Sequence, residues 1–302
     1  MKIVIGSRGS QLAMWQTHHI KALLEQAHPG LEIEIRKITT RGDAIQDIPL
    51  PKIGDKGLFT AEIEAELLAD NIQLAVHSLK DLPTTLPDGL VYGGSPPRAD
   101  ARDALISLKW HSIEDIPDNG TIATGSLRRK AAILNLKPGM QFTDLRGNID
   151  TRLRKLKENG WDGIIMAAAA LERLEMAGEI AAYLDPNCFV PSVSQGAIGL
   201  EVNASRRDVL ELLTAIVDEE TVQACKAERA FGRKLEGGCS VPLGAWARQE
   251  GDQLKLTGFV SNYAGTHQIR ESLTGSPEEA EVLGEKLAGR FISLGAKELL
   301  GS

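Results

Sequence analysis

The chain begins with MKIVIGSRGSQLAMWQTHHIKALLEQAHPGLEIEIRKI, residues 1–38, and this stretch decides the fold class. Residues 2–6 are mostly apolar and are typical of a buried strand. Residues 10–27 have the spacing of an amphipathic helix, and residues 31–38 alternate apolar and charged side chains as a strand does. A strand, a helix and a second strand in this order predict a β-α-β unit in a largely parallel sheet.

Similar units are predicted along the rest of the chain. Residues 39–56 are rich in Gly, Pro and Asp and predict a long loop. Further strands are predicted at 74–77, 121–124, 142–145, 163–166, 197–202, 243–249, 254–261 and 267–273, and further helices at 58–69, 126–136, 149–158 and 219–235. Proline-marked stretches at 96–103 and 190–193 indicate crossings between domains, and Ser276 to Glu279 predict a capping box that starts the last helix.

Size and composition limit the possible functions. The 302 residues suffice for two or three domains, and a net charge of -7 argues against general nucleic-acid affinity. The N-terminus lacks a signal-peptide pattern and no apolar run is long enough to span a bilayer, so we expect a cytoplasmic protein. The sequence also lacks a metal-ligand spacing and a phosphate-binding glycine loop, so no metal is predicted.

Of the three cysteines, Cys239 has the sequence context of a reactive thiol. It lies in LEGGCSVP, residues 235–242, where two glycines free the backbone before it and a proline fixes the chain after it. An exposed thiol on such a turn favours chemistry over packing. Cys188 and Cys225 are predicted to be structural, since Cys225 falls in a helical pattern and Cys188 precedes an apolar run.

Basic residues are concentrated locally, with nine Lys or Arg and two Asp between residues 124 and 157. Three predicted strand-to-helix turns each carry arginine: residues 7–10, 124–129 and 144–148. Free N–H groups at helix starts attract anions, and guanidinium forks bind carboxylates. These turns predict an anion site if two domains face each other, although a solvated helix face would give the same charge pattern.

A further polar group follows the strand at residues 74–77, where α/β sheets place ligand-binding side chains. The Asp81 carboxylate could move protons or hold a cation there, next to Lys80. The alternative is a surface turn or a helix cap. His77 is predicted to be a structural histidine with a satisfied hydrogen bond.

Taken together, these motifs resemble those of the porphobilinogen deaminase (hydroxymethylbilane synthase) family, and the resemblance runs nearly end to end. The matching pieces are TRGD (40–43), KGLF (56–59), AVHSLKDLP (75–83), GSLRR (125–129), LRGN (145–148), TRL (151–153), QGA (195–197) and LEGGCSVP (235–242). The resemblance implies an α/β fold of three domains. Residues 1–96 with 197–216, and residues 97–196, would form two lobes like those of periplasmic binding proteins, with mixed, mostly parallel sheets. Residues 217–302 would form a small α+β domain with an antiparallel sheet that carries Cys239.

The resemblance also implies an activity. The family is a transferase of tetrapyrrole and haem biosynthesis that condenses four porphobilinogen molecules head to tail and releases ammonia from each, and water then frees linear hydroxymethylbilane. A dipyrromethane cofactor would be attached through a thioether to Cys239. Porphobilinogen would be the partner of a cytoplasmic monomer, with neither nucleic acid nor membrane involved.

Site residues follow from the same motifs. Asp81 matches the catalytic aspartate, which would hydrogen-bond pyrrole N–H groups and stabilise the cation left when ammonia departs. Cofactor and substrate carboxylates would be bound by a larger set: Arg8, Ser10, Gln16, Ser78, Lys80, Thr124, Ser126, Arg128, Arg129, Arg146, Gly147, Asn148, Arg152, Arg173 and Gln195. The chain departs from the commonest pattern at Gly125, where many relatives have serine, and at Ser194, where glycine is usual.

Two other classes of function compete with this interpretation. A non-catalytic binding protein for a small anion could have the same two lobes. A cysteine hydrolase could use Cys239 as its nucleophile, but it needs a positioned histidine base, and the motifs mark none of the six histidines for that role.

Overall fold

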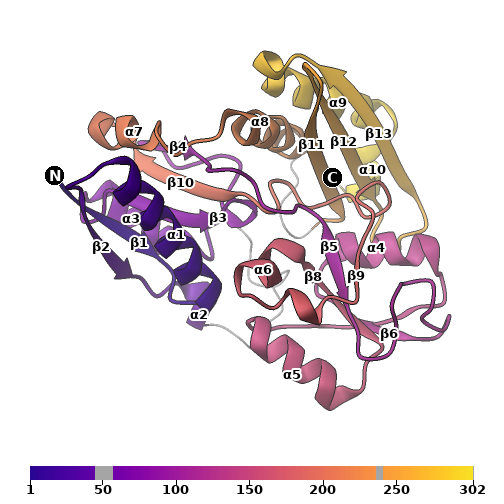
Figure 1. Ribbon diagram of the computed structural model, residues 1–302. Helices are drawn as coiled ribbons and strands as arrows, with labels where there is room; N and C mark the ends of the chain where they lie inside the picture. The colour runs from indigo at the N-terminus through magenta and orange to yellow at the C-terminus, as the bar shows by residue number, and fades with distance from the viewer. Residues whose placement is uncertain (45–56, 236–240, 302) are drawn as a thin grey trace. The chain divides into compact units, whose positions relative to one another are not determined.

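The computed structural model describes residues 1–44, 57–235 and 241–301. The chain divides into two compact units, whose helices and strands are labelled in Figure 1. The first unit contains Met1–Ala99 and Ala197–Val222, and the second contains Asp100–Gly196 and Gln223–Ser302.

The first unit is built on a five-stranded sheet with the order β2-β1-β3-β10-β4. Its strands are β1 (Lys2–Ser7), β2 (Glu32–Lys37), β3 (Leu74–Ser78), β4 (Leu90–Gly94) and β10 (Ile198–Asn203). β1 pairs in parallel with β2 and β3, whereas β10 pairs antiparallel with β3 and β4. Four strands therefore run in one direction, and the strand formed after the chain returns from residues 100–196 runs against them.

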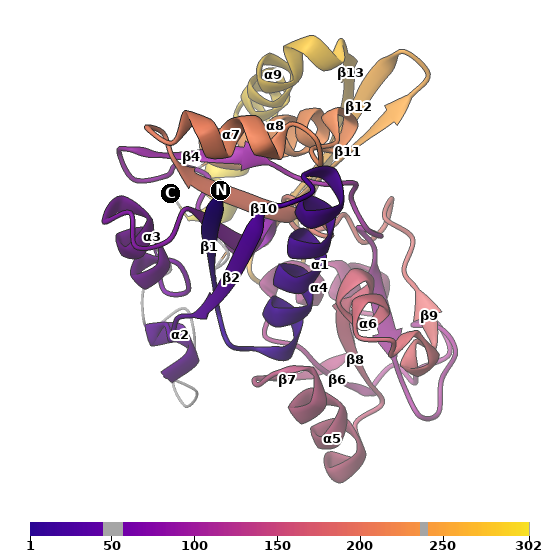
Figure 2. The same cartoon turned by 60° about the vertical axis from the view of Figure 1, so that its left-hand side comes forward.

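Helices cover both faces of this sheet (Figure 2). α1 (Gln11–Ala27) and α7 (Arg207–Leu213) share one core with β1, β3 and β10, while α3 (Ala61–Leu68) packs on the other face. Residues of β3 alternate between these cores, with Leu74 and Val76 on the α1 side and Ala75 on the α3 side. Two short elements complete the unit, α2 (Arg41–Ala44) and the 3₁₀ turn η2 (Leu79–Asp81).

The second unit repeats this topology. Its five-stranded sheet has the order β7-β6-β8-β5-β9, and β5 is the strand that runs against its neighbours. The strands are β5 (Asp103–Ile106), β6 (Thr121–Ala123), β7 (Gln141–Thr143), β8 (Gly163–Ala167) and β9 (Ala182–Tyr183). α5 (Ile149–Asn159) and α6 (Ala168–Arg173) contribute to the core on one face, and α4 (Leu127–Leu136) contributes to the core on the other.

A three-stranded antiparallel sheet completes the second unit, with the order β11-β12-β13. Its strands are β11 (Leu243–Glu250), β12 (Gln253–Ser261) and β13 (Gln268–Gly275). α8 (Glu219–Lys234), α9 (Ala280–Ser293) and α10 (Ala296–Leu300) share its main core. On its other side Phe259 packs against Ala131, so α4 contacts both sheets of the unit.

The predicted α/β class, with mixed and mostly parallel sheets and a small antiparallel sheet, is confirmed. Several short elements that lack a long apolar run were not predicted from the sequence, among them β4, β5, β9, α6 and α7. The predicted loop at 39–56 contains the helical turn α2, and its residues 45–56 lie outside the described part of the chain. The three-domain division stays a prediction, because the contacts group residues 100–196 with 223–302.

The predicted capping box at residue 276 is wrong. Ser276 precedes a 3₁₀ turn, Pro277–Glu279, and makes no side-chain cap, so α9 begins only at Ala280. Its hydroxyl instead donates to the Glu278 carboxylate.

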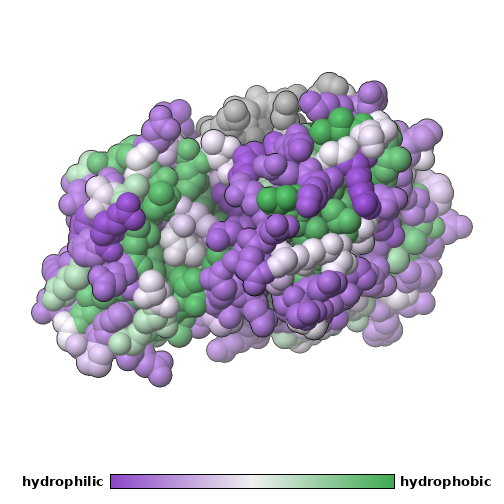
Figure 3. Space-filling view, turned by 90° about the horizontal axis from the view of Figure 1, so that it is seen from above, coloured by the Kyte–Doolittle hydropathy of each residue, from purple (hydrophilic) through white to green (hydrophobic). Residues whose placement is uncertain are grey.

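Among the described residues, no helix is both long enough and apolar enough to cross a bilayer. On the face shown in Figure 3, hydrophilic side chains are widespread and apolar ones lie among them.

Candidate active site

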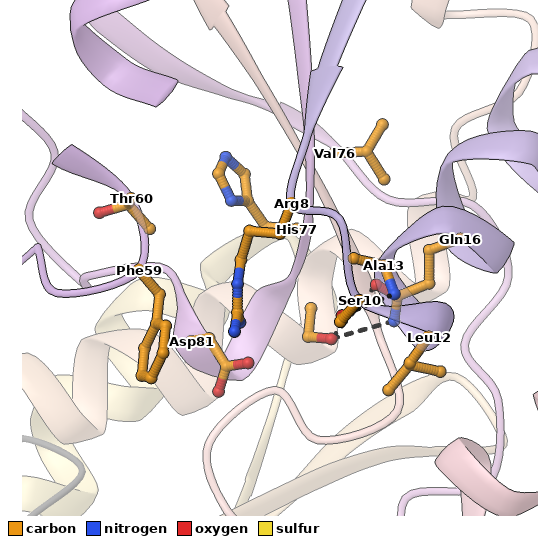
Figure 4. Close-up of a pocket in the computed structure, with 11 residues that line it drawn as sticks. Arg8, Ser10, Leu12, Ala13, Gln16, Phe59, Thr60, Val76, His77 and Asp81 are labelled. Atoms are coloured by element: carbon orange, nitrogen blue, oxygen red, sulfur yellow. Dashed lines mark hydrogen bonds between the residues drawn. The ribbon is translucent and has the colours of Figure 1, made fainter. Parts of the chain in front are cut away.

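A pocket in the first unit lies where β1 and β3 end (Figure 4). Because these strands are parallel neighbours, the residues that follow them meet at one edge of the sheet. The pocket is lined by Arg8, Ser10, Leu12, Ala13, Gln16, Phe59, Thr60, Val76, His77, Ser78 and Asp81. Five predicted site residues are therefore brought together here: Arg8, Ser10, Gln16, Ser78 and Asp81.

Asp81 is held at the pocket by the short turn η2. The turn is anchored by Leu79, which is fully buried and whose N–H donates to the Ala197 carbonyl at 3.0 Å. With Leu79 fixed inward, the Asp81 side chain is exposed and Lys80 is half-buried. The sequence thus places a carboxylate at the strand end on a short, anchored segment.

The opposite wall of the pocket is fixed by hydrogen bonds. Ser10 caps α1 by accepting from the Ala13 N–H at 3.3 Å. The amide of Gln16, buried on the same helix, donates to the Ser78 hydroxyl at 3.0 Å and so ties α1 to the end of β3.

Arg8 carries the positive charge of the pocket and is tied to Asp43. Its Nε lies 3.1 Å from Asp43 Oδ2 and its Nη2 lies 2.5 Å from Oδ1, and the guanidinium lies 4.2 Å from the centre of the Phe59 ring. Burial acts to raise the pKa of Asp43, but the Arg8 charge and hydrogen bonds from Arg8 and Thr40 outweigh it and lower the pKa. In Figure 4 the Arg8 side chain extends toward Phe59 and Asp81.

His77 has the structural role that the sequence predicted. Its Nε2 is 3.0 Å from Glu201 Oε2, and both side chains are buried. The ring points away from Asp81 in Figure 4. Behind it, burial raises the pKa of Glu64, and the negative charge of Glu201 acts in the same direction.

The second unit carries the main group of arginines at the start of α4. Ser126 caps this helix by accepting from the Arg129 N–H at 3.4 Å, and the Thr124 hydroxyl accepts from the Ser126 N–H at 3.1 Å. Both hydroxyl oxygens thus accept hydrogen bonds that fix the turn before the first residues of the helix.

Arg128 and Arg129 are both buried, and both pair with one carboxylate, Asp103. Arg128 Nη1 lies 2.8 Å from Asp103 Oδ2, and Arg129 Nη2 donates to Oδ1 at 2.7 Å. Burial acts to raise the pKa of Asp103, but the two arginine charges dominate and hold it far below its ordinary value. The Gln195 amide also donates to Oδ1, at 2.9 Å.

This cluster fits an anionic ligand. Two guanidinium groups share one carboxylate, so one positive charge is in excess within a buried site. Burial lowers the pKa of Arg128, and among the described residues its Nε finds no hydrogen-bond acceptor. Because a buried charge without a partner is costly, a ligand carboxylate would complete the cluster.

The next strand-to-helix turn and the start of its helix hold four further predicted residues. Asn148 caps α5 by accepting from the Thr151 N–H at 3.0 Å, and Arg152 Nε donates to the Gly147 carbonyl at 2.8 Å. Gly147 has a φ of 110°, and a Cβ there would lie 2.6 Å from Thr151, so the turn requires glycine. Arg146, beside it, is half-buried.

Arg173 lies at the end of α6 and bonds the loop that leads into β10. Its Nη2 donates to the Gly196 carbonyl at 2.7 Å. Burial lowers its pKa to about 10, so it remains charged at neutral pH.

Cys239 lies outside the described residues. The strand that follows it, β11, passes close to the arginine cluster, since a Cβ on Gly244 would lie 3.1 Å from Arg128 Cδ. The other cysteines match their predicted structural roles: Cys225 is fully buried in α8, and Cys188 packs at the edge of a core.

Three residues that line the pocket or hold arginines were not predicted from the sequence. Phe59 lines the pocket and packs on Arg8, while Asp43 and Asp103 hold the arginines in place. Phe59 and Asp43 belong to the KGLF and TRGD motifs, which could have suggested them. No motif indicated Asp103, because it lies at the end of the charged stretch at residues 96–103 that was predicted to cross between domains.

These sheets are those of an α/β protein that carries arginines at its strand-to-helix turns. Family models match residues 3–211, as "Porphobilinogen deaminase, dipyromethane cofactor binding domain", and residues 222–293, as "Porphobilinogen deaminase, C-terminal domain". The chain belongs to the porphobilinogen deaminase family, and is thus a transferase of tetrapyrrole biosynthesis with the domain that binds dipyrromethane.

Curated relatives cover nearly the whole chain. The porphobilinogen deaminase of Maridesulfovibrio salexigens is 45% identical over 299 residues, which are 99% of this chain and 97% of the relative. That of a Synechococcus species is 46% identical, over 98% of this chain and 94% of the relative. Among solved structures, a periplasmic substrate-binding protein from Coxiella burnetii gives a TM-score of 0.45 at 12% identity, over 75% of this chain and 96% of that one. The fold assignment rests on the strand order rather than on this likeness.

Proposed function

We propose that this enzyme condenses four porphobilinogen molecules head to tail into linear hydroxymethylbilane. Each condensation forms one carbon–carbon bond and releases one ammonia, and one water is consumed when the product is freed. The observation that carries the proposal is the pocket at the ends of β1 and β3, where the exposed Asp81 carboxylate and the Arg8 guanidinium line the same space. Such a pair suits an anionic substrate that becomes cationic at its reacting carbon.

Arginine side chains would bind the substrate. Each pyrrole carries an acetate and a propionate, and guanidinium groups bind carboxylates in bidentate geometry. We assign this role to Arg8, Arg128, Arg129, Arg146, Arg152 and Arg173, assisted by Ser10, Gln16, Ser78, Lys80, Thr124, Ser126, Gly147, Asn148 and Gln195.

Cys239 is the proposed attachment point of the cofactor, through a thioether. When bound, dipyrromethane supplies the pyrrole carbon to which the first substrate is joined. The buried excess charge at Arg128 and Arg129 suits its carboxylates.

Asp81 is the proposed catalytic residue. Its carboxylate would accept hydrogen bonds from pyrrole N–H groups and stabilise the positive charge that develops as the amine leaves. It could also hold the proton that the reacting carbon loses. Action as a cytoplasmic monomer, without nucleic-acid or membrane partners, is part of the same proposal and is supported by the family resemblance.

The experiment that tests this function measures ammonia and product together. Purified protein is incubated with porphobilinogen, released ammonia is quantified, and the product is identified by mass. We expect one ammonia for each porphobilinogen consumed and a linear product of four rings. Porphobilinogen that binds without releasing ammonia would instead support an anion-binding protein without catalysis.

A further inference from the structure

Asp103 is the buried carboxylate on which the arginine cluster is built, although no recognised motif contains it. It is the first residue of β5, in the interior of the five-stranded sheet of the second unit, and its side chain is fully buried. Its Oδ1 accepts hydrogen bonds from Arg129 and Gln195, and its Oδ2 forms an ion pair with Arg128 Nη1 at 2.8 Å.

We propose that Asp103 is a positioning residue of the carboxylate-binding site: it fixes Arg128 and Arg129 and cancels one of their two charges, so that this cluster accepts one ligand carboxylate. The inference rests on the proposed function, since it assumes that the ligand is a carboxylate-bearing pyrrole. Beyond that function, the inference assigns to Asp103 the ordering of both guanidinium groups before the ligand binds and the net charge of the site.

The geometry supports a preformed site. Each guanidinium has a second, backbone anchor besides Asp103: Arg128 Nη1 donates to the Val190 carbonyl at 2.7 Å, and Arg129 Nη1 donates to the Ile165 carbonyl at 2.9 Å. Arginine side chains lose much rotamer freedom when they are ordered. Because this freedom is lost on folding, it is not lost again when the ligand binds.

Gln195 acts on the same carboxylate from the other side. Its amide nitrogen donates to Asp103 Oδ1 at 2.9 Å and to the Ala101 carbonyl at 2.8 Å, and the side chain is fully buried. Gln195 therefore fixes the orientation of Asp103, and its predicted role in ligand binding is exerted at least in part through that carboxylate.

The net charge of Asp103, Arg128 and Arg129 determines how many ligand carboxylates this cluster can neutralise. Within the described residues, Asp103 is the one carboxylate paired with either arginine. Without it, two buried guanidinium groups would lack a counter-charge. With it, a single positive charge remains, and one ligand carboxylate neutralises the cluster.

The test compares Asp103→Asn with Asp162→Asn, a matched change in the same unit. Asp162 also receives two hydrogen bonds, from Trp110 Nε1 at 3.0 Å and the Thr121 N–H at 2.8 Å, but it contacts neither Arg128 nor Arg129. Both variants are measured for thermal unfolding, for the fraction carrying the two-pyrrole adduct by intact mass, and for KM and kcat of the loaded protein.

For Asp103→Asn we expect the loaded fraction to fall and KM for porphobilinogen to rise roughly tenfold or more, as when one partner of a buried charge pair is removed. Its kcat should change less than its KM, because Asp81 is untouched. For Asp162→Asn we expect a lower melting temperature with unchanged KM and loading. A folded Asp103→Asn with wild-type loading and KM would overturn the inference, while the loaded, active wild type would leave the proposed function standing.

If Asp103→Asn fails to fold, the double variant Asp103→Asn with Arg129→Gln decides the question. It restores the excess of one positive charge, so it should fold and show a cooperative melting transition where Asp103→Asn alone does not. A double variant that also fails to fold would contradict a cluster coupled by charge.

Discussion

Asp81 is exposed in the pocket because its neighbour two residues earlier, Leu79, is fully buried and bonded to the Ala197 backbone. The carboxylate is therefore presented by the turn that the packing and backbone hydrogen bond of Leu79 anchor. Arg8 is presented in a different way, through Asp43 and the Phe59 ring. Both charges of the pocket thus depend on residues that need not touch the substrate.

Asp81→Asn should keep its fold and its bound adduct but lose turnover by roughly 10²–10⁴-fold, the usual contribution of a general acid–base group. The substitution preserves size and removes the charge and the proton-transfer capacity. Asp81→Glu, which displaces the charge, should lose less. Steady-state rates are measured on protein confirmed as loaded by mass, with the exposed Asp88→Asn as the control. Turnover within a few-fold of wild type for Asp81→Asn would make Asp81 a turn residue.

The motifs could predict the residues that we assign to ligand binding, but they could not predict every residue that holds those side chains in place. Asp81 and the arginines lie in short, distinctive segments at strand ends. Asp103 pairs with residues 25 and 26 positions later in the chain, and Gln195 reaches it from 92 positions away. Such pairings are set by the strand order β6-β8-β5, which no local pattern encodes.

At the level of elements, α4 links the arginine cluster to the C-terminal sheet. Ala132 and Ile133 face the core under the five-stranded sheet, whereas Ala131 packs on Phe259 of β12. Gly244 in β11 lies so close to the 190–191 backbone that a Cβ there would be 2.7 Å from the Val190 oxygen. That oxygen is also the acceptor for Arg128.

Gly244→Ala should therefore destabilise the protein by about 1–3 kcal/mol, the usual cost of overpacking, and should lower cofactor loading by displacing Val190 and Arg128. Gly125→Ala is the matched control near the same helix, because its Cβ would meet only the Leu145 oxygen at an ordinary 3.5 Å. Chemical denaturation and intact mass give the two readouts. Equal stability of the two variants would contradict the close approach of β11 to the arginine cluster.

Elements with long apolar or alternating runs were predicted within a few residues, including β1, α1, α5 and the three C-terminal strands. β5 was not predicted because its four residues follow the charged segment RADAR, residues 98–102. The local hydrophobic pattern therefore does not indicate that this strand is buried. The start of α9 was misplaced because residues 277–279 form a 3₁₀ turn before the α-helix begins at Ala280.

At the level of the whole molecule, the two five-stranded sheets share one topology and one arrangement of turns. In each five-stranded sheet the first parallel strand is followed by a turn with arginine and by a helix capped by serine, Ser10 for α1 and Ser126 for α4. In each sheet the reversed strand, β10 or β5, comes from the part of the chain that crosses between units. The arginine-bearing turns proposed to bind anions thus follow from the repeated topology as well as from individual arginines.

We expect this chain to carry a dipyrromethane cofactor on Cys239, and intact-mass spectrometry of the purified protein measures that adduct directly. The wild type should exceed the mass of its sequence by two pyrrole units, and Cys239→Ala should match its sequence mass. A wild type without the adduct, prepared under conditions in which it turns over porphobilinogen, would contradict the claim. So would Cys239→Ala that still carries two rings, because the attachment point would then be another residue.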